Sequence, residues 1–198
     1  YVPAPVNGID LFSEANYNFG SGTRAIVRLR YEDKLDSYTD YDIHKKILYC
    51  GNRSSLRFEF KHKAAKNLRL RMRLESAVVN FDGKLPEESG MGGFGEFTWG
   101  ILKFARINCR VAYFSTDSYN SAIWQYEYAM PGYMTVRALY GEGMRTYASI
   151  KIMPIKNLTL WLRYSYEIKN NSETFGSGNN EINGNSRSMA LVQLDFVY

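Results

Sequence analysis

The 198-residue sequence predicts an all-β fold, in the form of an antiparallel transmembrane β-barrel of about 10–12 strands or the C-terminal part of a larger barrel. The first observation is that apolar and charged residues alternate with a period of two in segment after segment. The second is that the chain ends in such a segment, Ser188–Tyr198. The third is that the connections are of two kinds, short and long. Residues 1–198 are expected to form a single domain.

The wall strands are predicted from the period of two. In Leu68–Glu75 the leucines and Met72 alternate with Arg69, Arg71 and Arg73. Thr23–Glu32 and Ser54–Lys63 follow the same pattern, and no long segment has the 3.6-residue period of an amphipathic helix. About eleven strands are therefore expected, at residues 9–19, 23–32, 54–63, 68–81, 94–103, 106–114, 122–128, 133–139, 144–153, 158–168 and 188–198.

The last strand indicates the compartment. Its polar face includes Gln193 and Asp195, whereas its apolar face runs to the final residue. A soluble protein rarely ends on the tip of an apolar stripe, but the closing strand of an outer-membrane barrel faces lipid. The expected localisation is the outer membrane of a Gram-negative bacterium. The apolar face of this strand consists of Ala190, Val192, Leu194, Phe196 and Tyr198.

The connections support this interpretation. Residues 20–22, 64–67, 130–132 and 154–157 and the stretch around Ala105 are short, whereas residues 33–53, 82–93, 115–121 and 169–187 include long polar segments. Short turns at one end and long loops at the other are typical of outer-membrane barrels, whose short turns are periplasmic. An odd strand number conflicts with the even numbers of bacterial single-chain barrels. Either a strand at 94–103 or 133–139 is absent or strands are missing before Tyr1, and we favour the second.

Composition is compatible with a barrel. The mean hydropathy is −0.37, and no apolar run approaches the ~18–20 residues of a spanning helix. Aromatic residues make up 15% of the chain, and those near strand ends are expected to form interfacial girdles. The net charge of +5 is compatible with an anionic partner. The girdle residues would include Tyr31, Phe104, Tyr113, Trp124, Trp161, Tyr164, Phe196 and Tyr198.

The two cysteines and two histidines do not indicate a site. Cys50 and Cys109 are either disulfide-bonded or two separate thiols, and with His44 and His62 they do not have the spacing of a zinc site. His44 and His62 are interpreted as surface residues, because no Gly-x-Ser-x-Gly motif accompanies them. Asp117 is expected to serve in a turn. No metal or other cofactor is predicted.

Several stretches are shared with a known family in order and spacing. They are Phe114–Ser121 with Tyr126-Glu127, Leu139–Tyr147, Lys156–Arg163, and Phe175–Gly178 followed by Glu181-Ile182 and Gly184-Asn185. Over roughly residues 54–198 the chain thereby resembles the C-terminal barrel region of Bacteroidota helix-hairpin-helix proteins, a competence-related outer-membrane family. The family commonly has Lys where this chain has Glu142. Its barrel region is also longer than this chain, which agrees with missing strands.

The resemblance implies DNA handling for the family, but the helix-hairpin-helix repeats that would grip DNA are absent from residues 1–198. Nucleic acid is therefore a partner by family implication alone. The direct partner predicted is outer-membrane lipid, together with other outer-membrane or periplasmic subunits of a complex.

The charged faces of the strands are the candidate functional feature. Arg or Lys at the bilayer midplane costs ~2–4 kcal/mol on a lipid-facing position, so these side chains are expected to face the lumen. They either attract anions such as a phosphorylated polymer, or fill the lumen through pairing of Arg with Glu, including Glu32, Glu96, Glu127 and Glu167. The predicted lumen-facing residues are Arg28, Arg30, Arg57, Arg69, Arg71, Arg73, Arg110, Arg163, Glu59 and Glu75.

The sequence therefore predicts a non-enzymatic, porin-like outer-membrane barrel with a structural, anchoring or transport role. Two alternatives stay open. One is an outer-membrane barrel enzyme that acts on lipid or peptide, which would need a nucleophile close to a histidine. The other is a soluble β-barrel that binds a small ligand.

Overall fold

The computed structural model contains strands and turns, and no helix, in the part of the chain that it describes. Described are residues 7–40, 45–83, 85–133, 135–170, 172–176 and 181–197, without the side chains of residues 34–40 and 45–50. The strands are β1 (Ile9–Gly20), β2 (Thr23–Asp40), β3 (Lys45–His62), β4 (Leu68–Asn80), β5 (Glu88–Leu102), β6 (Ala105–Thr116), β7 (Ile123–Tyr126), β8 (Val136–Leu139), β9 (Glu142–Ile155), β10 (Leu158–Asn170), β11 (Thr174–Phe175), β12 (Ile182–Asn183) and β13 (Ser186–Phe196).

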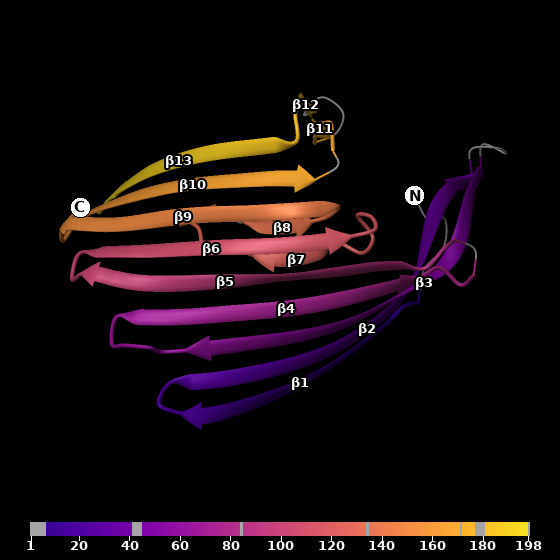
Figure 1. Cartoon of the computed structure of the whole chain (residues 1–198), viewed down its shortest axis with the longest axis horizontal. Helices are drawn as coiled ribbons and strands as arrows, with labels where there is room; N and C mark the ends of the chain where they lie inside the picture. Colours follow the sequence, from indigo (N-terminus) through magenta and orange to yellow (C-terminus); the bar gives the residue numbers. More distant parts are fainter. Residues whose placement is uncertain are drawn as a thin grey trace.

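One large sheet forms the fold. Its strand order is β1-β2-β3-β4-β5-β6-β9-β10-β13, and each neighbouring pair is antiparallel. Figure 1 shows a curved sheet with β1 and β13 at opposite edges. The all-β, antiparallel prediction is confirmed, and the sheet is open between these two strands within the described residues.

Every predicted strand range overlaps a strand of the structure. Two of them are not wall strands, because among the described residues β7 and β8 pair only with each other, as a hairpin. A second small hairpin, β11–β12, lies between β10 and β13. The expectation that 122–128 and 133–139 contribute to the barrel wall is therefore wrong, whereas 94–103 does lie in a wall strand, β5.

The ends of the sheet differ as the sequence predicts, except that residues 130–132 belong to the β7–β8 connection and not to a turn of the large sheet. The β1–β2, β3–β4, β5–β6 and β9–β10 connections are short turns at one end, and the longer connections lie at the other (Figure 1). The predicted loop at 33–53 is wrong, because β2 and β3 continue through it and pair as far as Asp40 and Lys45. His44 lies outside the described residues.

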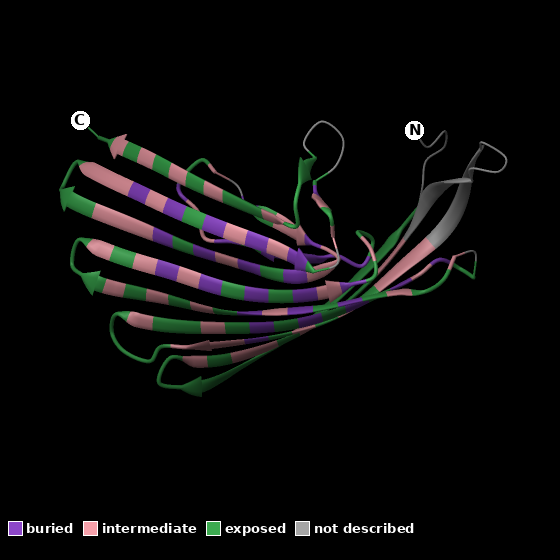
Figure 2. Ribbon diagram, turned by 45° about the horizontal axis from the view of Figure 1, so that its top comes forward, coloured by how far each residue is buried: buried purple, intermediate pink, exposed green. Residues whose placement is uncertain are grey.

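Burial along the strands is inverted relative to a soluble protein. On β4, Arg73 and Glu75 are buried, whereas Met72 and Leu74 are 57% and 60% exposed. Figure 2 shows this alternation of buried and exposed residues on successive positions of the central strands. We call the two sides the polar face, which carries Arg73, and the apolar face, which carries Leu74.

Cross-strand pairing continues each face over the whole sheet. Leu29 lies opposite Leu56, and Phe58 lies opposite Leu74, while at the far edge Leu162 lies opposite Val192. Because the side chains of paired residues project on the same side, the apolar face is continuous from β1 to β13.

The exposed area supports the inversion. The chain exposes 12986 Å², against about 9,600 Å² for a compact soluble monomer of its 22.8 kDa. Large apolar side chains contribute to this exposed area, including Val192 and Leu194 at 70% and 65% exposure. Contiguous apolar surface on this scale marks a membrane or protein contact.

Candidate functional site

The candidate site is the polar face together with the β7–β8 hairpin that covers its centre. The strand register places all ten predicted charged residues on this face. Arg30 and Arg71 lie two positions along from Arg28 and Arg69 and therefore share their face. The other pairings are Arg28 opposite Arg57, Arg57 opposite Glu75, Glu59 opposite Arg73, Arg110 opposite Glu96, Arg69 opposite Thr98, and Arg163 opposite Ser149.

The carboxylate of Glu59 on β3 forms ion pairs with three cationic side chains. Its Oε2 accepts hydrogen bonds from Arg73 Nε and Nη2 at 3.0 and 2.9 Å and from Arg71 Nη2 at 3.0 Å. Its Oε1 lies 2.7 Å from Lys61 Nζ. The carboxylate and Arg73 are buried, so this cluster depends on mutual pairing for its charges to be tolerated.

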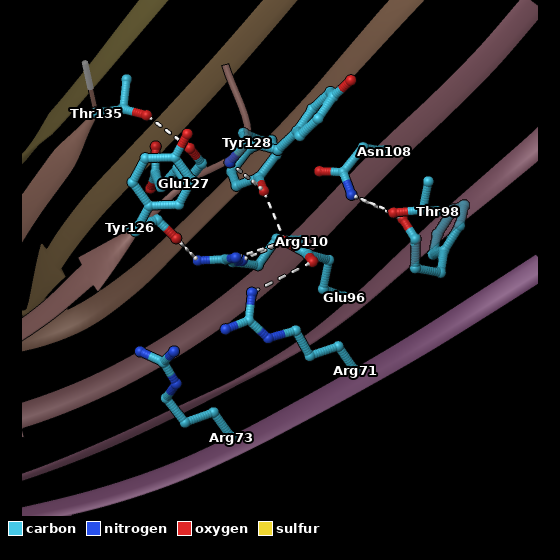
Figure 3. Close-up of polar contacts among 12 residues, drawn as sticks. Arg71, Arg73, Glu96, Thr98, Asn108, Arg110, Tyr126, Glu127, Tyr128 and Thr135 are labelled. Atoms are coloured by element: carbon cyan, nitrogen blue, oxygen red, sulfur yellow. Dashed lines mark hydrogen bonds and ion pairs between the residues drawn. The ribbon is translucent and has the colours of Figure 1, made fainter. Parts of the chain in front are cut away.

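Glu96 on β5 forms the next cluster, shown in Figure 3. Its Oε2 accepts hydrogen bonds from Arg110 Nε and Nη2 at 2.9 and 2.5 Å and from Tyr147 Oη at 2.8 Å. Arg71 Nη1 lies 4.0 Å from Glu96 Oε1, which links this cluster to that of Glu59. The Arg110 guanidinium carbon also lies 3.8 Å from the centroid of the Phe94 ring, a cation–π distance.

The hairpin is attached to this ladder of charges through its backbone. Arg110 Nη1 donates to the carbonyl of Tyr126 at 2.9 Å (Figure 3). Closer to the β1 edge, Arg53 Nη2 donates to the carbonyl of Ala122 at 2.7 Å. Two wall arginines thus hold the β7 side of the hairpin against the polar face.

Two glycines of β5 make the close approach possible. A Cβ on Gly90 would lie 2.2 Å from the backbone oxygen of Ser121, and one on Gly92 would lie 3.3 Å from Ile123 Cγ1. Any side chain at Gly90 would therefore displace the hairpin. Ser121 and Ile123 are completely buried there.

Glu127 follows β7 and is the charged centre of the contact. Its Oε1 accepts from Arg145 Nε at 2.5 Å and its Oε2 from Arg145 Nη2 at 3.0 Å. Arg163 Nη2 also donates to Oε2, and Arg145 Nη1 donates to Glu167 at 2.8 Å. All four side chains are at most 6% exposed. Glu127 thereby connects the hairpin to β9 and β10.

The predicted arginines near the β1 edge are partly solvated. Arg28 donates to Glu14 at 2.9 Å through Nε, and Arg30 donates to both oxygens of Asp10 at 2.9 and 2.6 Å. Their side chains are 36% and 46% exposed. Pairs of this kind contribute little to stability.

Arg57 and Arg69 differ in their environments. Arg57 makes two hydrogen bonds to Glu75, at 2.8 and 3.1 Å. Arg69 is exposed and has no hydrogen bond or ion pair within the described residues. Most residues of the predicted set thus have a partner of opposite charge on the polar face.

A cavity of about 360 Å³ lies on the polar face between the hairpin and the β1 edge. Trp124 of the hairpin forms one wall, and Arg28, Arg30, Arg53 and Arg57 line it. The charged lining includes Asp10, Glu32 and Glu75. The hairpin therefore covers the centre of the polar face and leaves this charged cavity on one side of it.

Sequence reasoning missed the role of Arg145 and the position of the hairpin. Arg145 could have been found, because it recurs at a spacing of two with Tyr147, Ser149 and Lys151 and so shares one face of β9 with them. The sequence predicts that Glu127 lies on a wall strand and pairs with a neighbouring wall strand. Glu127 belongs instead to the hairpin segment after β7, from which it pairs with Arg145 and Arg163 of the wall.

The expected aromatic girdle is corrected at two positions. Trp161 lies on the polar face, 5% exposed, and donates to Asp195 Oδ2 at 3.0 Å. Trp124 belongs to the hairpin. Tyr113, Tyr164 and Phe196 are exposed on the apolar face.

The residues considered for catalysis have structural partners. His62 Nδ1 lies 2.8 Å from Thr23 Oγ1, directly across the β2–β3 ladder. Within the described residues no carboxylate hydrogen-bonds His62 to orient it as in a catalytic triad. Asp117 accepts from Ser89 N and Oγ at 2.7 and 3.1 Å. Cys109 is a free thiol, and the side chain of Cys50 lies outside the described residues.

Comparison with solved structures gives a likeness of the fold to a porin. No family model and no curated protein matches the chain. Among solved structures, a NanC porin is similar to it, with a TM-score of 0.45 and 10% sequence identity over 96% of this chain and 94% of the porin. No helix in the described residues is long and apolar enough to cross a membrane.

Proposed function

We propose that this chain forms the wall of an outer-membrane β-barrel, with the apolar face toward lipid and the polar face toward a lumen. The inverted burial carries the proposal: buried Arg73 and Glu75 alternate on β4 with exposed Met72 and Leu74. A sheet in water would expose its charges and bury its leucines, whereas lipid reverses both preferences.

The role that fits this wall is transport or anchoring without catalysis. Among the side chains that the structure describes, cations exceed anions on the polar face, and this favours anionic cargo over cationic cargo. The basic residues of the wall strands on this face are Arg24, Arg28, Arg30, Arg53, Arg57, Lys61, Arg69, Arg71, Arg73, Arg106, Arg110, Arg145, Lys151, Arg163, Lys169 and Arg187. The acidic residues are Asp10, Glu14, Glu32, Glu59, Glu75, Glu88, Glu96, Glu167 and Asp195.

In this proposal the β7–β8 hairpin is a constriction inside the lumen. Arg110, Arg53 and Glu127 fasten it to the wall. The cavity beside Trp124 is then the part of the lumen that stays open to solutes. The family resemblance implies nucleic acid as a partner, and nucleic acid would bind the same cationic face. The helix-hairpin-helix repeats of that family would then have to be supplied from outside residues 1–198.

Fractionation of cells that express the protein tests the proposal. The protein should sediment with outer membranes, resist extraction by carbonate, and migrate faster in detergent gels before boiling than after. Recovery in the soluble fraction without detergent would contradict the membrane location and favour the alternative of a soluble ligand-binding β-protein.

A further inference from the structure

The two edges of the sheet run in the same direction. Eight pairings lead from β1 to β13, and all eight are antiparallel. Strand direction reverses at each pairing, so an even number of reversals leaves β13 pointing the same way as β1. Direct pairing of the two edges would therefore be parallel.

Both edges are long and amphipathic. β1 has 12 residues and β13 has 11, and within the described residues neither pairs with a strand on its outer side. Leu11 on β1 is 61% exposed, and Leu194 on β13 is 65% exposed. The apolar face thus extends to both edges of the sheet and includes large exposed side chains on both edge strands.

These edges cannot remain open in the setting of the proposed function, on which this inference rests. Each unpaired N–H or C=O group in the hydrocarbon costs several kcal/mol, roughly, and a row of such groups along a whole strand is not tolerated there. The edges must be joined within the membrane.

A second copy of this sheet does not join them antiparallel. Two copies inserted in the same orientation present β1 and β13 pointing the same way, so contacts between the two sheets would again be parallel. Antiparallel pairing of β1 with β1 of another copy would require that copy to be inserted upside down. Neither arrangement gives the uninterrupted antiparallel ladder of an outer-membrane barrel.

We propose that an odd number of further amphipathic strands, from outside the nine-stranded sheet, joins β1 to β13. An odd number restores antiparallel pairing at both edges and brings the total to an even number. The joining strands carry alternating apolar and polar residues, and their apolar residues continue the rows that include Leu11 and Leu194.

Cysteine pairing tests whether the edges meet directly. Cys50 and Cys109 are replaced by Ser, and Ser13→Cys is combined with Val192→Cys in the full-length protein in native outer membranes. The matched control combines Ala15→Cys with Val27→Cys, which lie opposite each other on β1 and β2. The control should form a disulfide under mild oxidation and the edge pair should not. Efficient bonding of the edge pair would overturn the proposal.

A photoreactive residue at Ser13 or Val192 identifies the neighbour. After irradiation in the native membrane, mass spectrometry should find adducts to a peptide from outside residues 9–196. Adducts to β1 or β13 of the same or a second copy, or adducts to lipid alone, would overturn the proposal. Carbonate extraction in the same sample separates this outcome from failure of the membrane location.

Discussion

The carboxylate of Glu127 and the guanidinium of Arg145 form a buried two-point ion pair, with Nε–Oε1 at 2.5 Å and Nη2–Oε2 at 3.0 Å. Glu127 belongs to the segment after β7, whereas Arg145 belongs to wall strand β9. The pair therefore fixes an internal hairpin to the wall, and it indicates which substitutions should release that hairpin.

Glu127→Gln should loosen the hairpin. Removing this charge leaves buried Arg163 without its carboxylate partner and leaves Arg145 with Glu167 alone, and loss of one partner of a buried pair costs about 3–5 kcal/mol. Unfolding by guanidinium in detergent micelles measures the change. Glu181→Gln, at an exposed loop position, is the control and should leave the midpoint unchanged. Equal midpoints for the two variants would contradict the anchoring role of Glu127.

Gly90→Val should displace the hairpin without removing a charge. Its Cβ would lie 2.2 Å from the oxygen of Ser121, whereas a Cβ on Gly95 has no atom within 4 Å. Chymotrypsin digestion in micelles should cut the Gly90→Val variant near Tyr126 faster than the parent. Gly95→Val should be cut at the parent rate. Equal rates for both variants would show that the hairpin is not held at Gly90.

Leu74→Arg should impair assembly in lipid. Leu74 is 60% exposed on the apolar face of β4, and Arg at the midplane of a barrel costs ~2–4 kcal/mol. Leu102→Arg, at the end of β5, should cost about 0–1 kcal/mol because it lies near the interface. The folded fraction in liposomes, measured by heat-modifiable migration, distinguishes the two positions. Similar folded fractions would argue against lipid contact at Leu74.

Removal of the hairpin should widen the passage. Replacing residues 119–140 by a short Gly-Ser linker exposes the arginines that the hairpin covers. Single-channel conductance in planar bilayers should rise, and the reversal potential should show a stronger preference for anions. Conductance equal to that of the parent protein would mean that the hairpin does not narrow the pathway.

The wall could be predicted because alternation reports directly on the two faces of a strand. Arg71, Met72 and Arg73 show the pattern in three consecutive residues, and the structure puts them on alternating faces. Continuation of β2 beyond Glu32 was not predicted, because residues 33–40 are mostly polar and lack a period of two. Their pairing with β3 is set by the ladder that begins at Thr23 and His62.

The hairpin could not be predicted because its residues alternate between two faces with the same period of two as the residues of a wall strand. Ile123 and Gln125 are buried and alternate with exposed Trp124 and Tyr126, as they would in a barrel. Only its length, four residues in each strand, separates it from strands that can span a bilayer. Gly90 and Gly92 signal its docking, but their partners come from a distant part of the chain.

Quenching of tryptophan fluorescence by brominated lipid tests the central claim, the inverted faces, most directly. Trp99 and Trp161 occupy neighbouring levels of the sheet, because Trp99 lies opposite Ile107, Ile107 opposite Ile150, and Ile150 opposite Leu162. Trp99 is 43% exposed on the apolar face, and Trp161 is 5% exposed on the polar face.

The measurement uses two variants that each retain one of these tryptophans, reconstituted in vesicles of lipid brominated close to the carbonyl groups. The account predicts strong quenching of Trp99 and little quenching of Trp161. Equal quenching of both, or stronger quenching of Trp161, would contradict a sheet whose apolar face meets lipid and whose charged face is turned inward.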